Sequence, residues 1–70
     1  MHGTLIRKYR IQKEFSQEYM ASQLNICQEA YSKIELNKTE LTVKRLYQIA
    51  SILGIPIYEL LSEENIPNSI

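Results

Sequence analysis

The chain has 70 residues, of which 44% are hydrophobic, with two glycines, two prolines and a formal net charge of zero. This length allows one domain with one core, and the composition favours a packed all-α globule over a disordered chain or a loop-rich β fold. A single cysteine and the lack of a paired Cys/His pattern exclude an internal disulfide and a zinc site. No apolar run has the length of a signal peptide or a membrane span, so we expect a cytoplasmic protein without metal, cofactor or membrane partner.

The zero net charge conceals an uneven distribution along the chain. All eight cations lie within the first 45 residues together with five acids, whereas residues 46–70 carry three acids and no cation. This separation favours a molecule with a basic face for phosphates and an acidic end directed away from them. Small enzymes and adaptors can be polarised in the same way, so the charge alone leaves the class open.

The first predicted helix runs from Leu5 to about Lys13. Thr4 is a suitable N-cap for it, because a threonine oxygen can accept a hydrogen bond from a first-turn amide. Ile6, Tyr9 and Arg10 follow the i, i+3, i+4 spacing and therefore share one face of this helix.

A second helix is predicted to start after Ser16, its N-cap, and to end near Leu24. Its apolar stripe comprises Met20, Ala21 and Leu24. Asn25 follows where the chain must turn, and asparagine tolerates the left-handed backbone conformation better than most residues. A tight turn should therefore separate this helix from the next.

Three more helices are predicted in the rest of the chain. The third starts at Cys27 or Gln28 and ends near Leu36, and Thr42 caps the fourth. Gly54 stops the fourth helix, a last helical segment covers 57–62, and 63–70 form a tail. The inner face of the fourth helix comprises Leu46, Ile49, Ala50 and Leu53. Five short helices with about three residues between the second and third are typical of a helix-turn-helix domain, here over 1–62.

The order of three segments resembles the Xre/Cro/CI family of helix-turn-helix regulators. The segments are Phe15 to Ile26, Tyr31-Ser32-Lys33-Ile34-Glu35, and Leu46 to Leu61 with its ending Leu53-Gly54-Ile55-Pro56. The resemblance covers about residues 5–62. It implies a compact, all-α, five-helix fold like that of the lambda repressor, and a transcriptional regulator that reads the major groove of double-stranded DNA with its third helix.

Matching positions of the family imply roles at the DNA. Gln17 corresponds to a glutamine that bonds a phosphate and braces the first residue of the recognition helix. Gln28 corresponds to that first residue, and a glutamine there can contact N6 and N7 of adenine. The other residues implied to face DNA are Glu29, Ser32 and Lys33 on the third helix, and Asn37 and Lys38 in the following loop. The alternative for Gln28 and for Lys38 is a solvated surface residue.

Two further implied roles are structural. Arg10 and Glu35 match an ion pair that joins the first and third helices in phage members of the family. Met20, Ala21, Leu24, Ile26 and Ile34 are expected in the core. A homodimer is expected through the C-terminal end, where the apolar surface comprises Ile55, Ile57, Tyr58 and Leu61. The alternative is that Ile57 and Leu61 close the core of the monomer.

The sequence departs from the family pattern at three positions of the motif. Asn25 replaces the usual turn glycine, and Cys27 replaces the usual serine or threonine cap of the third helix. Glu29 places a negative charge at the groove-facing end of that helix. This charge favours the helix dipole and repels phosphates, unless it accepts a hydrogen bond from N4 of cytosine.

An enzyme is not expected, because the chain has one histidine, one cysteine, no aspartate and no glycine-rich phosphate loop. The main alternative is a protein-interaction module, such as an antitoxin that binds a toxin, or an adaptor, with weak or no DNA binding. Such a module can share the same fold.

Overall fold

The computed structural model describes residues 2–61, and all regular structure in this range is helical. The five helices are α1 (His2–Gln12), α2 (Gln17–Leu24), α3 (Gln28–Glu35), α4 (Val43–Leu53) and α5 (Ile57–Leu61). The predicted all-α class with five short helices is therefore confirmed. The predicted tail at 63–70, and the last residue of the predicted final helix, lie outside the described residues.

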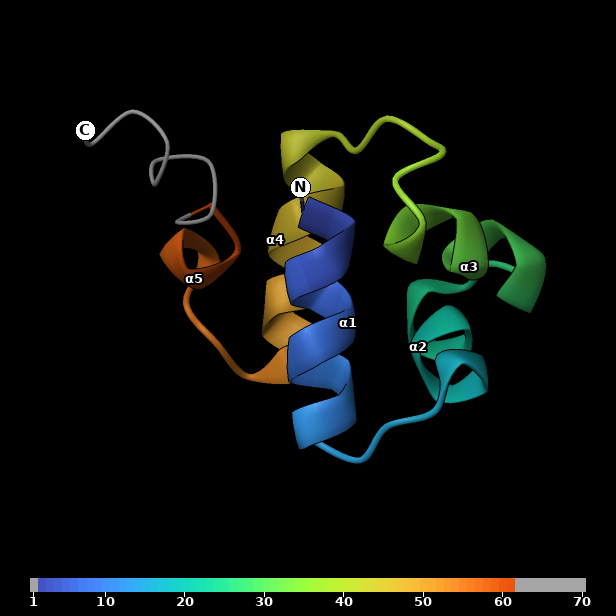
Figure 1. Ribbon diagram of the computed structural model, residues 1–70, viewed down its shortest axis with the longest axis horizontal. Coiled ribbons are helices and arrows are strands. Elements are labelled where there is room, and N and C mark those ends of the chain that lie inside the picture. The colour runs from blue at the N-terminus through green and yellow to red at the C-terminus, as the bar shows by residue number, and fades with distance from the viewer. Residues whose placement is uncertain (1, 62–70) are drawn as a thin grey trace.

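The helices form a small bundle around α1, which contacts α3, α4 and α5 (Figure 1). In Figure 1, α2 and α3 lie together on one side of α1, and α5 lies on the opposite side. A long connection from α3 to α4 passes over the end of the bundle where the N-terminus lies. The α2–α3 pair is thus presented at one edge of the molecule, away from α5.

One hydrophobic core holds the bundle together and includes residues from all five helices. Its largest fully buried side chains are Ile6, Met20, Tyr31, Ile49, Leu53 and Leu60. The predicted inner face of α4 is confirmed, because all four of its residues are buried. Of the core residues predicted in the α2–α3 region, Met20, Ala21, Leu24 and Ile34 are buried, and Ile26 is partly buried against the core.

Four of the helices end in the same way, with a residue in the left-handed conformation. These residues are Glu14 (φ 63°), Asn25 (φ 62°), Asn37 (φ 61°) and Gly54 (φ 71°). In each case the amide of the following residue donates to a carbonyl five positions earlier, as in Phe15 N to Arg10 O at 3.1 Å. This pattern is the Schellman motif, which satisfies carbonyls at a helix end. The left-handed turns predicted at Asn25 and Gly54 are confirmed.

The predicted caps at the start of α2 and α4 are also confirmed. Ser16 Oγ accepts from Tyr19 N at 2.9 Å, and Thr42 Oγ1 accepts from Arg45 N at 3.0 Å. Cys27 precedes α3 in an extended conformation but forms no side-chain capping bond. The departure noted at Cys27 therefore leaves the first turn of α3 without a side-chain cap.

The predicted start of the first helix is wrong. Thr4 does not cap it, because α1 already begins at His2 and Thr4 lies within its first turn. The physical reason is an acceptor from elsewhere in the chain, since the amide of Gly3 donates to Oδ1 of Asn37 at 3.0 Å. A first-turn amide with such a partner does not need a local serine or threonine.

Within residues 2–61, no helix has the length and apolar character required to cross a membrane.

Candidate nucleic-acid interface

The turn between α2 and α3 sets the geometry of the candidate site. Asn25 ends α2 in the left-handed conformation, and its amide donates to Ser22 O. Ile26 packs partly buried against the core, and α3 begins two residues later at Gln28. The three-residue connection thus anchors its middle residue inside the molecule and leaves the start of α3 at the surface.

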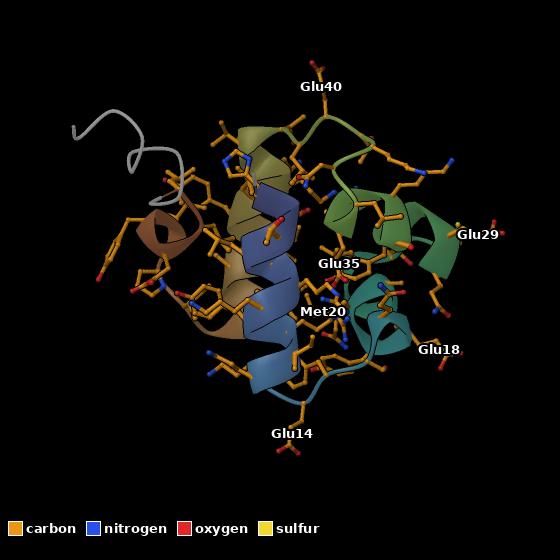
Figure 2. All side chains as sticks on the ribbon, viewed as in Figure 1. Glu14, Glu18, Met20, Glu29, Glu35 and Glu40 are labelled. Atoms are coloured by element: carbon orange, nitrogen blue, oxygen red, sulfur yellow. The ribbon has the colours of Figure 1, made fainter. Side chains whose placement is uncertain are left out.

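The two faces of α3 differ sharply in exposure. Tyr31, Ile34 and Glu35 are buried against the rest of the bundle. Gln28 and Glu29 at the start of the helix are exposed. Figure 2 shows Glu29 pointing outward from α3 and Glu35 pointing inward towards α1. This arrangement leaves a polar helical face free to approach another molecule.

The outer face of α3 and the following loop form a shallow depression. It is lined by Glu29, Ser32, Lys33, Leu36 and Lys38. Four of the residues that the resemblance implied at the DNA are therefore brought together, two of them cations and one an acid. The apolar Leu36 was not among the predicted residues, and it is 58% exposed.

Behind this face, the buried carboxylate of Glu35 accepts hydrogen bonds from three side chains. Its Oε2 accepts from Arg10 Nε at 2.5 Å and from the Tyr31 hydroxyl at 2.5 Å. Its Oε1 accepts from Gln17 Nε2 at 3.0 Å and from a second Arg10 nitrogen at 3.3 Å. The cluster joins α1, α2 and α3, because each of these helices contributes at least one member.

The electrostatics of this cluster favour its charged form. Burial raises the pKa of the Glu35 carboxyl, but hydrogen bonds from Arg10, Tyr31 and Gln17 outweigh burial and hold that pKa below its ordinary range. The hydrogen bond to Glu35 also raises the pKa of Arg10, and burial raises that of Tyr31. Glu35 is therefore a charged and fully hydrogen-bonded group inside the protein.

Arg10 and Glu35, which the resemblance implied to be paired, are brought together by the structure, and Arg10 also donates to the carbonyl of Phe15 at 2.8 Å. Gln17 has a partner within the protein that the resemblance did not imply. Its side-chain amide donates to Glu35, at the junction of α2 and α3, rather than to the first residue of α3.

Asn37 is also engaged within the protein. Its Oδ1 accepts from Gly3 N, so the structure connects this residue, implied to lie at the DNA, to the start of α1. Lys38 follows it on the exposed side and lines the depression.

The residues implied in dimerisation lie at the other side of the molecule. Tyr58 is 65% exposed and Leu61 is 37% exposed, whereas Ile55 and Ile57 are partly buried against the core. Leu60 is the fully buried residue of α5. The Tyr9 hydroxyl donates to Glu59 Oε1 at 2.6 Å, which ties α5 to α1.

Two residues of the site were missed by sequence reasoning. Tyr31 was named only within the segment that resembles the family, although its i, i+4 spacing from Glu35 was a usable signal for a side-chain contact on one helix face. Gly3 carried no signal, because its partner Asn37 is 34 positions away.

Two helices joined by a short turn, the second with a polar outer face, are typical of a helix-turn-helix protein. The family model described as "Helix-turn-helix domain" matches residues 3–66, and the chain belongs to this family.

Two curated relatives of the chain come from Bacillus subtilis (strain 168). One, named SPbeta prophage-derived uncharacterized HTH-type transcriptional regulator YonR, is 38% identical over 55 residues, which cover 79% of this chain and 51% of the relative. The other, named uncharacterized HTH-type transcriptional regulator YqaE, is 37% identical over 65 residues, which cover 93% and 56%. The chain thus spans about half the length of these relatives. No solved structure matches it at a significant level.

Proposed function

We propose that the protein is a sequence-specific DNA-binding transcriptional regulator of the Xre/Cro/CI type, and that α3 reads the major groove. The names of the two relatives support the regulatory class. The observation that carries the proposal is the position of α3. Its inner face is anchored by a buried ion pair, and its outer face exposes polar side chains at the start of the helix. A major groove admits one α-helix held in this way.

The proposed contacts divide into base reading and backbone binding. Gln28 is the proposed adenine reader, and Glu29 the proposed acceptor for N4 of cytosine. Lys33, Ser32 and Lys38 line the same depression and suit phosphate or base-edge contacts. Glu29 lines the same depression, and its carboxylate would disfavour DNA sequences that offer it no hydrogen-bond donor, so Glu29 is a specificity element in this proposal.

We further propose that Gln17 and Arg10 contribute to DNA binding indirectly, because their hydrogen bonds to Glu35 hold α3 in position. Gln17 lies at the start of α2, and its amide bond to Glu35 fixes its side chain beside the recognition helix. Its phosphate contact, implied by the resemblance, would then come from an already oriented group.

The proposed assembly on DNA is a homodimer through the surface around α5. One recognition helix provides only a few base-reading side chains, and two copies read two half-sites about 34 Å apart. The exposure of Tyr58 and Leu61 supports this choice of contact surface. The same surface includes Ile55 and Ile57, which also pack partly buried against the core.

Binding to a random pool of duplexes, followed by selection and sequencing, tests the proposal. We expect enrichment of a sequence with two related half-sites, and an electrophoretic shift that weakens as salt increases because phosphate contacts release counterions. Failure to enrich any sequence, together with no salt-dependent shift of a random duplex, would contradict it. That result would favour a protein-interaction module. Glu29 and the neutral net charge would then explain why the protein does not bind DNA.

A further inference from the structure

The first turn of α1 lies directly against the C-terminal end of α3. Gly3 is buried there, and its amide donates to Asn37 Oδ1 at 3.0 Å. A Cβ atom at Gly3 would come closer than 3.0 Å to the backbone oxygens of Ile34 and Glu35 and to the Asn37 side chain. Because two of these three atoms belong to the backbone, only glycine fits without a shift of one helix against the other.

Asn37 is itself held in place by the end of α3. Its backbone is left-handed, with φ 61°, and its amide donates to Ile34 O at 3.2 Å. The next amide, that of Lys38, donates to Lys33 O at 2.9 Å. The Asn37 side chain therefore starts from a backbone that the helix end already fixes, and its oxygen reaches across to α1.

The two helix ends are also electrostatically matched. The first amides of a helix have no partner within it and carry partial positive charge, whereas its last carbonyls carry partial negative charge. Here the first turn of α1 faces the last carbonyls of α3, at Ile34 and Glu35. This contact meets the same end of α3 as the Arg10–Glu35 ion pair, because Glu35 is the last residue of α3, and it adds a restraint on Asn37, which lies beyond the helix.

We propose that Gly3 and Asn37, here called the α1–α3 clasp, are positioning residues that fix the C-terminal end of α3 and the attached Lys38 for DNA binding. The effect of the clasp on DNA binding rests on the proposed function, whereas the existence of the clasp does not depend on that function. The proposal assigns Asn37 a different role from a direct phosphate contact. The two roles differ in what they do to sequence preference, because phosphate contacts carry no sequence information.

Hydrogen exchange at the Gly3 amide tests the clasp without DNA. A first-turn amide normally lacks a hydrogen-bond partner and exchanges fast, so protection at Gly3 reports the bond to Asn37. We expect Asn37→Gly to reduce this protection about tenfold, and Asn37→Asp, which keeps the oxygen, to retain it. Glycine suits the left-handed position, so Asn37→Gly should stay folded. Equal Gly3 exchange in wild type and Asn37→Gly would overturn the clasp.

The DNA consequence is tested with two duplexes, one selected by the wild-type protein from a random pool and one of unselected sequence. We expect Asn37→Gly to lower the ratio of the two affinities about tenfold, because α3 loses its placement against the bases. Asn37→Asp should weaken both duplexes by charge repulsion and leave their ratio near that of the wild type. Gly3→Ala should lower the ratio as Asn37→Gly does, and the exposed Thr4→Ala is the matched control.

An equal loss on both duplexes in Asn37→Gly would show a phosphate contact and overturn the positioning role. If the wild-type protein selects no duplex from the random pool and does not bind the unselected one, the proposed function fails, whereas Gly3 exchange in the same variants still decides whether the clasp exists.

Discussion

Glu35 shows how one buried carboxylate can be accommodated in a small helical protein. Its side chain is only 2% exposed, and a charge at such a position is costly unless a partner and hydrogen bonds compensate for burial. Arg10 supplies the charge, and Tyr31 and Gln17 supply further donors. Arg10 lies on α1, Gln17 on α2 and Tyr31 on α3 itself, so the cluster fixes α3 against its neighbours while its outer face remains free.

Removing either member of the ion pair should have unequal effects on stability. Arg10→Met leaves a buried carboxylate without its cation, so we expect a loss of about 3 kcal/mol in the free energy of unfolding. Glu35→Gln keeps a hydrogen-bonding side chain in the same place and should cost less, about 1–2 kcal/mol. Urea denaturation of both variants, with the exposed Lys13→Met as control, measures the difference. Equal and negligible losses would show that the pair does not hold α3.

The same carboxylate predicts a dependence of stability on pH. Because the folded protein holds the pKa of Glu35 below its ordinary value of 4.5, the unfolded chain takes up the proton first as the pH falls. The stabilisation is therefore complete above the ordinary pKa and is lost as the pH falls through the lower folded value. Denaturation of wild type and Glu35→Gln between pH 7 and about pH 3 should show their difference shrinking. A constant difference, with exposed Glu40→Gln as control, would contradict this.

On the outer face of α3, Gln28 and Lys38 should differ in the kind of DNA binding that they support. Gln28→Ala removes base reading without removing a cation, so it should weaken binding to a selected duplex by about 1–3 kcal/mol and leave unselected DNA nearly unaffected. Lys38→Ala should weaken both alike. Affinity measured on both duplexes at one salt concentration decides the matter, and an unchanged order of preference in Gln28→Ala would refute the base-reading role.

At the scale of elements, helix boundaries were predictable where a local residue has a known preference for a cap or a turn. Ser16 and Thr42 cap the helices that follow them, and Asn25 and Gly54 end the helices before them, as their residue types indicated. The start of α1 was not predictable, because its determining contact comes from Asn37. The left-handed end at Glu14 was not predictable either, because a glutamate has no preference for that conformation.

The left-handed backbone at Glu14 therefore indicates a position where a substitution should stabilise the protein. A residue with a Cβ in the left-handed conformation is strained, and Glu14→Gly should raise the free energy of unfolding by about 1 kcal/mol. Figure 2 shows the Glu14 side chain pointing away from the bundle, so little packing is lost. Glu14→Ala removes the carboxylate but not the strain and should give no such gain.

Gly54→Ala should lower the free energy of unfolding by about 1 kcal/mol. The cost comes from the left-handed backbone at φ 71° alone, because no atom lies within 4 Å of the new Cβ. Thermal denaturation measures all three variants.

For the candidate site, sequence reasoning separated buried from exposed positions well, but beyond the Arg10–Glu35 pair it did not identify the partners of polar side chains. The spacing of apolar residues identified the core of α2 and α4, because burial follows helical periodicity. Gln17 and Asn37 are two examples. Each has an amide that can bond several groups, and only the three-dimensional arrangement decides that their partners are Glu35 and Gly3.

At the scale of the whole molecule, the two candidate surfaces lie at opposite sides of the bundle. The α2–α3 pair and α5 flank α1 on different sides, and α5 is tied to α1 by the bond between Tyr9 and Glu59 (Figure 1). Interaction through α5 therefore leaves the outer face of α3 accessible. A two-fold dimer on DNA also requires that both copies of α3 face one duplex at once, which depends on the direction of the two-fold axis at the α5 surface.

The dimer itself gives the final prediction. Tyr58 is 65% exposed and Leu60 is fully buried, so Tyr58→Glu places a charge on the proposed contact surface without opening the core. We expect the wild-type protein to sediment as a dimer on a selected duplex with two half-sites, and Tyr58→Glu to bind that duplex more weakly while binding a single half-site equally well. Tyr47→Glu, at an exposed tyrosine of α4, is the matched control. A wild-type monomer that binds an isolated half-site as tightly as the complete site would refute the dimer.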